Sequence, residues 1–219
     1  MELKKTADGS HTLYVKELNE TYHSIHGAIQ EARHVFIKNG LNYFNPTSNV
    51  SILEVGLGTG LNAILTCLDA NDRIGEVHYT TVEKFPLSSN LIQQLNYASI
   101  LELTDEAKQW FEQIHAASHQ SVAIHPRFRF TKHHTDIHQF TAHQLFDVIY
   151  FDAFAPEKQA EMWTPELFKK MFDLLHPNGI LVTYCAKGVV KRTIKSVGFT
   201  LETLQGPPGK REMIRGIKS

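Results

Sequence analysis

In this 219-residue chain, a short apolar run leads directly into three closely spaced glycines. Val50–Val55 predicts a buried strand, Gly56, Gly58 and Gly60 follow it, and Leu61–Leu68 predicts a helix. Glycine lets the backbone turn tightly and approach a ligand without a Cβ clash, and the amides at a helix N-terminus form a polar cradle. The segment therefore predicts a strand, a ligand-binding loop and a helix.

The same alternation continues along the chain. Further strands are expected at His78–Glu83, near Phe128–Phe130, at Phe146–Asp152 and at Gly179–Tyr184, with helical stretches up to about Ser118 and from Thr164-Pro165-Glu166 to Pro177-Asn178-Gly179. Such alternation predicts an α/β fold with a parallel sheet, helices on both faces, and ligands at the carboxyl ends of the strands. Thr200–Leu204 and Glu212–Ile217 predict an antiparallel last pair, which distinguishes the class I methyltransferase form of the Rossmann-like sheet from the dehydrogenase form.

An N-terminal extension precedes this core. Leu3–Thr6 and Thr12–Val15, joined by a turn at Asp8-Gly9, predict a β-hairpin that forms a flap or lid. Apolar residues at helical spacing predict an amphipathic helix over His23–Lys38. We expect one domain over residues 1–219, with the extension in 1–45 and the Rossmann-like core in 46–219.

Length and composition exclude several classes of protein. The chain has no run of about 18 apolar residues, and its first residues lack the apolar stretch of a signal peptide, so we expect a cytoplasmic protein without membrane contact. Cys67 and Cys185 stand far apart and are expected as free thiols. The histidines between His115 and His143 lack the cysteine or acidic pattern that completes a metal site, so no metal is expected.

The net charge of −1 conceals an asymmetry. From Lys187 to Ser219 the chain carries eight basic residues against two acidic ones. A local cationic face is sufficient for nucleic-acid binding, because neutralising phosphates supplies much of the affinity. Composition alone favours scattered solvated charge, so this segment is a candidate RNA face only if other features support it.

The residues around the glycine loop narrow its ligand. Leu61 stands where a dehydrogenase would place its third glycine, and Glu54 lies two residues before the first. S-adenosylmethionine ends in a zwitterionic amino acid, whose ammonium a carboxylate attracts directly or through water. Glu83, at the second strand end, suits the ribose hydroxyls, and Asp136, after the third, suits the adenine amino group. Together these acids favour S-adenosylmethionine as the ligand.

Asp152 follows the fourth strand, where an acid would face the methyl donor. It would accept a hydrogen bond from an attacking amine and align the lone pair for in-line transfer, and it is also a candidate base. Phe154 and Trp163 are either core residues or walls of the acceptor pocket that stack on a base.

With these residues in place, the chain resembles the family of tRNA wobble-uridine methyltransferases formed by the MnmC N-terminal domain and stand-alone MnmD. The resemblance covers nearly the whole chain. Its blocks are Tyr22-His23-Ser24 with Gly27-Ala28, Glu31 and His34-Val35-Phe36; Glu54 to Asn62; Glu83 to Leu87; Asp152 to Pro156 with Met162-Trp163-Thr164; Thr183 to Ala186 with Val190-Lys191-Arg192; and Gly209 to Met213.

The resemblance implies methyl transfer from S-adenosylmethionine to the primary amine of 5-aminomethyl(-2-thio)uridine in the tRNA anticodon loop. The cofactor positions it implies are Glu54, Gly56, Gly58, Gly60, Asn62, Glu83, Asp136 and Asp152, with Asp152 also at the reacting centre. The substrate and RNA positions are Tyr22, Phe154, Trp163, Lys191, Arg192, Lys210 and Arg211. A wobble base in a single-stranded loop can be splayed out and stacked.

Two departures from the family pattern bear on the activity. No flavin domain follows the methyltransferase, so removal of a carboxymethyl group is not expected, and Glu157–Glu161 lacks an expected Asn-Pro pair. No obligate protein partner is indicated. The alternatives are a small-molecule amine methyltransferase, which would act without tRNA, and a non-catalytic RNA-binding module, which would not bind S-adenosylmethionine.

Overall fold

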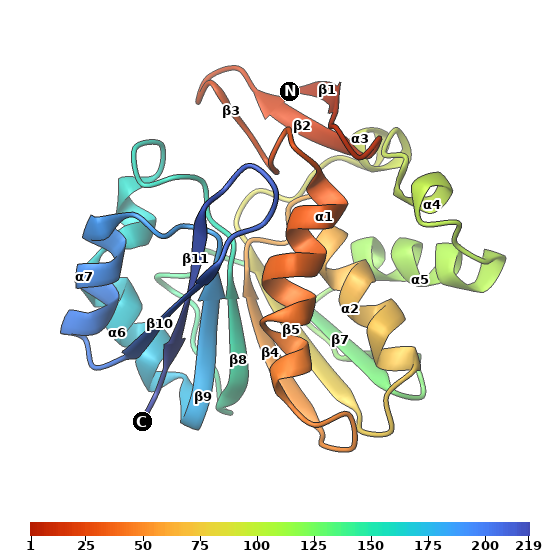
Figure 1. Cartoon of the computed structure of the whole chain (residues 1–219). Helices are drawn as coiled ribbons and strands as arrows, with labels where there is room; N and C mark the ends of the chain where they lie inside the picture. Colours follow the sequence, from red (N-terminus) through yellow and green to blue (C-terminus); the bar gives the residue numbers. More distant parts are fainter.

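Eight strands form one central sheet in the computed structural model, which describes residues 1–219 (Figure 1). Their order across the sheet is β10-β11-β9-β8-β4-β5-β7-β6. Their bounds are β4 (Val50–Val55), β5 (Val77–Glu83), β6 (Val122–His125), β7 (Phe128–His134), β8 (Phe146–Phe151), β9 (Leu175–Thr183), β10 (Thr200–Gln205) and β11 (Glu212–Ile217). The five central strands β9, β8, β4, β5 and β7 run parallel to one another. Strand β11 is antiparallel to both of its neighbours, β9 and β10. The expected class I methyltransferase sheet with an antiparallel last pair is confirmed.

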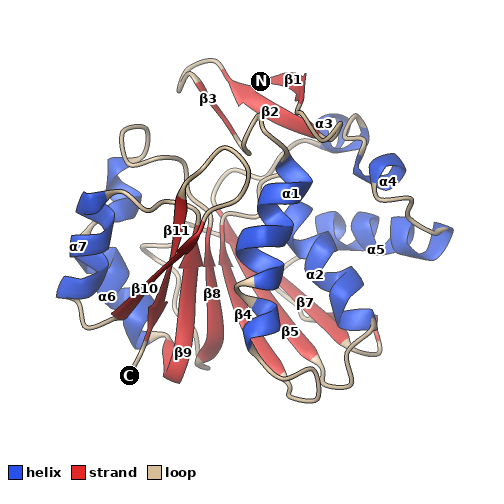
Figure 2. Cartoon of the chain, viewed as in Figure 1, coloured by secondary structure: helices blue, strands red, loops and turns tan.

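Helices cover both faces of this sheet (Figure 2). Their bounds are α1 (Ala28–Ala32), which continues as a π-helix over Arg33–Lys38, α2 (Leu61–Asn71), α3 (Ser89–Gln93), α4 (Tyr97–Ile100), α5 (Asp105–Ala116), α6 (Pro165–Asp173) and α7 (Gly188–Ser196). Side chains alternate along β4, so Ile52 packs in the cluster under α1, α2 and α5, and Leu53 packs in the cluster under α6 and α7. Burial on both faces explains the continuous apolar runs of the central strands. None of the helices is both long enough and apolar enough to cross a bilayer.

A small three-stranded sheet lies above the carboxyl ends of the central strands (Figure 1). It comprises β1 (Glu2–Lys5), β2 (His11–Val15) and β3 (Glu20–Thr21), paired antiparallel in sequence order. The predicted hairpin is therefore present, with one added strand. The His11 backbone N–H donates to Asn96 Oδ1 at 2.8 Å, which ties this sheet to the segment before α4. The chain leaves β3 directly into the region of the glycine loop.

Two predicted helices differ from those observed. The helix expected from His23 begins only at Ala28, because Gly27 before it has φ 140°, outside the helical region. The helical stretch expected after Glu83 is three short helices, α3 to α5. Ser88 and Thr104 cap two of them by accepting hydrogen bonds from backbone N–H groups, so local capping divides the stretch.

The predicted end of α6 was also wrong. Thr164 caps this helix as expected, with its hydroxyl accepting from the Leu167 N–H, but the helix ends at Asp173. Pro177-Asn178-Gly179 lies within β9, where the register against β8 shifts between Phe146 and Val148 and Asn178 adopts φ 63°. These turn residues make a bulge in a strand rather than a helix terminus. The edge strand β6 and the helix α7 were not among the predicted elements.

Candidate active site

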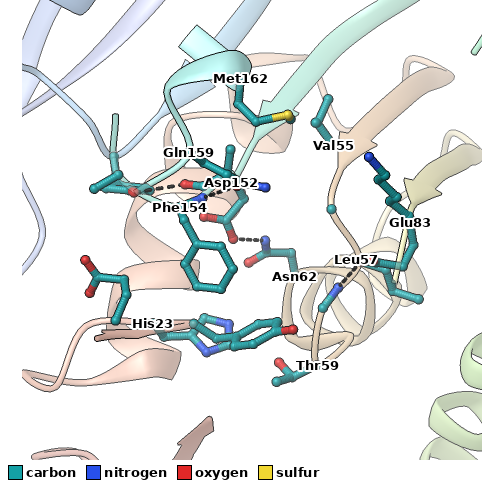
Figure 3. Close-up of a pocket in the computed structure, with 18 of the residues that line it drawn as sticks. His23, Val55, Leu57, Thr59, Asn62, Glu83, Asp152, Phe154, Gln159 and Met162 are labelled. Atoms are coloured by element: carbon teal, nitrogen blue, oxygen red, sulfur yellow. Dashed lines mark hydrogen bonds between the residues drawn. The ribbon is translucent and has the colours of Figure 1, made fainter. Parts of the chain in front are cut away.

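A cavity of about 550 Å³ opens at the carboxyl ends of β4, β5, β7 and β8, beneath the segment that follows β3 (Figure 3). The glycine loop forms one wall, and Glu83, Asp136 and Asp152 contribute from three strand ends. The acids that the sequence places at successive strand ends therefore share one cavity, apart from Glu54. Parallel strands bring their carboxyl ends to the same edge, which is why residues distant in sequence meet here.

The glycine loop is held in a conformation that only glycine adopts easily. Gly58 has φ +51°, and a Cβ at this position would lie 2.9 Å from Cδ1 of Tyr22. The Tyr22 ring therefore packs directly on the loop, and it also meets Phe154 edge to face with centroids 5.1 Å apart. Burial raises the pKa of Tyr22 to about 12, so its hydroxyl stays protonated. Two of the three predicted aromatic residues, Tyr22 and Phe154, line the cavity.

Glu83 connects the end of β5 to the glycine loop. Its Oε2 accepts from the Gly58 N–H at 2.9 Å (Figure 3). Its Oε1 accepts from the Phe85 N–H at 2.7 Å. Each carboxylate oxygen can accept more than one hydrogen bond, so lone pairs remain for ligand hydroxyls. The geometry suits a ribose diol held beside the loop.

Glu54 lies behind the loop and does not line the cavity. Its side chain is fully buried, and neither carboxyl oxygen has a hydrogen bond of ordinary geometry. Burial raises its pKa well above the ordinary value, and nearby polar groups of Thr81, Tyr79 and Asn62 only partly oppose the rise. The predicted direct contact between Glu54 and a ligand ammonium is not possible in this arrangement, because the side chain is fully buried and does not line the cavity. Asn62, which does line the cavity, has a buried Oδ1 without a partner that could accept from such an ammonium.

Asp152 follows β8 and faces the cavity half-buried. The Asn62 amide Nδ2 donates to its Oδ2 at 2.8 Å (Figure 3). Burial raises the pKa of Asp152 to about 7, the hydrogen bond from Asn62 opposes this, and the charges of Glu31 and Lys210 act in opposite directions. A carboxyl group whose pKa lies near neutral pH is ionised in a large fraction of molecules and can still accept a proton.

Asp136 reaches the cavity from the end of β7 but already has protein partners. Lys84 Nζ lies 2.8 Å from Oδ2, and the His138 backbone N–H donates to Oδ1 at 2.9 Å. The hydrogen bond with Lys84 is the main cause that holds its pKa well below the ordinary value. Asp136 is thus a fixed anion at the cavity rim, with lone pairs left for an amino group.

Trp163 requires a correction. It is 7% exposed, lies in the core beneath α6 and does not line the cavity. Its indole N–H donates to the Phe154 carbonyl at 2.8 Å. The Phe154 N–H in turn donates to Gln159 Oε1 at 3.1 Å (Figure 3). Trp163 therefore supports the loop that carries Phe154 and cannot stack on a substrate. Gln159, in the segment that departs from the family pattern, closes the same loop.

The four basic residues expected on the RNA face divide into two kinds. Lys191 forms an ion pair with Glu212, and Lys210 lines the cavity in an ion pair with Glu31. Arg192 is exposed, and the Arg211 side chain is 94% exposed. The prediction that Lys210 contacts a phosphate at the surface is therefore wrong. Lys210 lines the cavity, because its ion pair with Glu31 holds the side chain inward.

Three cavity residues were given no role by the sequence. His23 is buried, and burial lowers its pKa to about 4, so the ring is neutral at physiological pH. Tyr184 donates its hydroxyl to the Ala153 carbonyl at 2.9 Å. Glu31 projects from α1. Two signals for Glu31 were available in the sequence: its place in the family resemblance, and a charged residue among apolar helix positions.

Sequence comparisons place the chain among known enzymes. The sequence model of the S-adenosyl-L-methionine-dependent methyltransferases matches residues 101–219. A protein of Pseudoalteromonas atlantica named tRNA 5-methylaminomethyl-2-thiouridine biosynthesis bifunctional protein MnmC is 31% identical over 239 aligned positions. The alignment includes 99% of this chain and 33% of that protein, so the chain spans about a third of its relative's length.

Solved structures agree on the fold. MnmC2 from Aquifex aeolicus superposes with a TM-score of 0.77 at 22% identity, covering 100% of this chain and 70% of that one. CalS10 from Micromonospora echinaspora, an amino pentose methyltransferase solved with S-adenosylmethionine bound, gives a TM-score of 0.54 at 13% identity, covering 88% and 92%. The expected fold, S-adenosylmethionine as cofactor and the resemblance to MnmC are thereby confirmed. The chain belongs to the S-adenosyl-L-methionine-dependent methyltransferase family.

Proposed function

We propose that this protein transfers a methyl group from S-adenosylmethionine to the primary amine of 5-aminomethyl(-2-thio)uridine at the tRNA wobble position. The observation that carries the proposal is Asp152, which shares one cavity with the glycine loop and has its pKa raised to about 7. The likeness to MnmC supports the choice of tRNA as substrate. Such a substrate also supports the predicted cytoplasmic location.

The residues present fit the cofactor. The N–H groups of Leu57 and Thr59 in the glycine loop and the free Asn62 Oδ1 would hold the amino-acid end, Glu83 the ribose and Asp136 the adenine amino group. When bound, S-adenosylmethionine supplies a methyl carbon that becomes bonded to the amine nitrogen as the carbon–sulfur bond breaks and its electron pair stays on sulfur.

The chain's own residues prepare the amine. An alkylamine is mostly protonated at neutral pH and must lose a proton before it can attack. Asp152 can take that proton at Oδ1 or Oδ2 and orient the lone pair, while Asn62 fixes the rotamer of the carboxyl group. Tyr22 and Phe154 would enclose a splayed uracil and exclude water from the reacting atoms.

The direct test uses labelled S-adenosylmethionine and tRNA that carries the 5-aminomethyl group. We expect label in 5-methylaminomethyl(-2-thio)uridine after nucleoside analysis, and none with tRNA that lacks the aminomethyl group. Absence of methyl gain would contradict the proposal. Turnover on free amines without tRNA would favour a small-molecule enzyme, and calorimetry without cofactor binding would favour an RNA-binding module.

The exposed arginines predict a salt-sensitive contact with tRNA. Replacing Arg192 and Arg211 together by alanine is expected to raise the Kd for tRNA and to reduce the slope of log Kd against log salt by about two, or about one per lost phosphate contact. Filter binding at several salt concentrations measures both. Lys38→Ala, at the exposed end of the π-helix, is the control. An unchanged slope in the double variant would contradict the proposed face.

A further inference from the structure

A second carboxylate, that of Glu31, opens onto the same cavity as Asp152. Glu31 is 6% exposed and stands on the buried face of α1, beside Ala28 and Ala32, which are 0% and 1% exposed. A buried carboxylate is costly unless it is paired, and an apolar residue here would pack without that cost. The position therefore calls for a role beyond stability of the helix.

Glu31 is held by contacts from three parts of the chain. Its Oε2 accepts from the Ser24 N–H at 2.8 Å, and its Oε1 is paired with Lys210 from the loop between β10 and β11. The Lys210 ammonium also lies 3.8 Å from the centroid of the Tyr184 ring. Tyr184 in turn bonds the carbonyl of Ala153, the neighbour of Asp152. Glu31 is thus fixed in relation to the loop that carries Asp152.

The charges in this part of the cavity favour a cationic ligand. Around Asp152 stand the carboxylate of Glu31 on α1, the phenol of Tyr184 just after β9 and the ammonium of Lys210, whereas Glu54 lies buried outside the cavity. The Asn62 amide on α2 completes the set. Two of the four acceptor sites on the Glu31 carboxylate are used, so others remain for an incoming N–H group.

We propose that Glu31 binds the alkylammonium of the methyl acceptor and delivers it to Asp152, with Lys210 as the positioning residue that holds Glu31 in place. The inference rests on the proposed function in taking an amine as the acceptor. The proton that Glu31 helps to orient leaves the nitrogen for Asp152 before the nitrogen attacks. Glu31 keeps its ion pair with Lys210 throughout.

The first test measures binding rather than turnover. Free 5-aminomethyluridine and the uncharged 5-methyluridine are titrated by NMR into the protein with S-adenosylhomocysteine present. We expect the wild type to prefer the amine by about tenfold or more, and Glu31→Gln to bring the two Kd values within about threefold, because one charge-assisted contact is lost. Glu20→Gln, which changes another acid lining the cavity, should keep the preference.

Several results of this titration would overturn the inference. They are a wild type without preference for the amine, no detectable binding of either nucleoside, a Glu31→Gln variant that keeps the full preference, or an equal loss in Glu20→Gln. If the wild type shows the Glu31-dependent preference but never methylates tRNA, the proposed function fails and the inference stands.

The second test follows the pH dependence of kcat/KM. Activity requires ionised Asp152, so its acid limb in the wild type should lie near pH 7. Glu31→Gln removes a charge that raises the pKa of Asp152, so the limb should move to lower pH. Lys210→Met removes a charge that lowers it, so the limb should move to higher pH. An acid limb that stays in place in both variants would show that the two charges do not act on Asp152, and that result would overturn the inference.

Discussion

Asp152→Ala is expected to lower kcat by about 10²- to 10⁴-fold, the usual range for loss of a positioned acid or base. The substitution removes the carboxyl group that aligns the amine and accepts its proton. The Kd for S-adenosylmethionine should change only a few-fold, because the loop amides and Glu83 are untouched. Single-turnover rates with aminomethyl tRNA and calorimetry with the cofactor measure the two quantities separately.

The control for this variant is Asp173→Ala, which removes an exposed acid on α6. It should leave both kcat and cofactor affinity near the wild-type values. If Asp152→Ala instead lost turnover and cofactor affinity equally, Asp152 would be a cofactor-binding residue and the acceptor's proton would leave by another route.

Glu83→Ala is expected to raise the Kd for S-adenosylmethionine by about ten- to hundredfold. Hydrogen bonds to a charged group contribute about 1.5–3 kcal/mol, and about 1.4 kcal/mol corresponds to a tenfold change in Kd. The variant loses the acceptors for the ribose and also frees the N–H groups of Gly58 and Phe85, which Glu83 holds at 2.9 and 2.7 Å. Cofactor affinity therefore falls through lost contacts and through a looser loop.

Calorimetry measures this change, with Glu76→Ala as the matched control. Glu76 is a partly exposed acid beside the other end of β5, far along the strand from the cavity. It should leave the cofactor Kd unchanged. A Glu83→Ala variant that binds S-adenosylmethionine as tightly as the wild type would refute the ribose contact.

The cofactor half of the site could be predicted because it follows from short local patterns. A buried strand such as Val50–Val55 and the glycines after it fix where the loop lies, and each acid at the end of a parallel strand must reach the same edge. The acceptor half could not be predicted in this way. Glu31 and Lys210 are 179 positions apart, and only the tertiary structure brings them together.

The direction in which a side chain points was the second property that the sequence could not predict. The sequence placed Trp163 near the acceptor but could not say which way its indole points, and the structure turns it into the core beneath α6. Glu54 likewise precedes the loop, yet strand alternation directs its carboxyl group toward α2 and away from the cavity. In both cases a residue is close along the chain but faces the wrong side.

The position of β11 between β9 and β10 has a consequence for how the protein is made. A ribosome delivers β10 before β11, and β10 has no neighbour in the sheet until β11 inserts beside β9. The glycine loop, between β4 and α2, leaves the ribosome well before β11 pairs with β9. Lys210 lies in the connection between β10 and β11, which is positioned only when β11 joins the sheet. In a nascent chain, the half of the cavity that binds the nucleoside of the methyl donor should therefore form before the half that binds the amine.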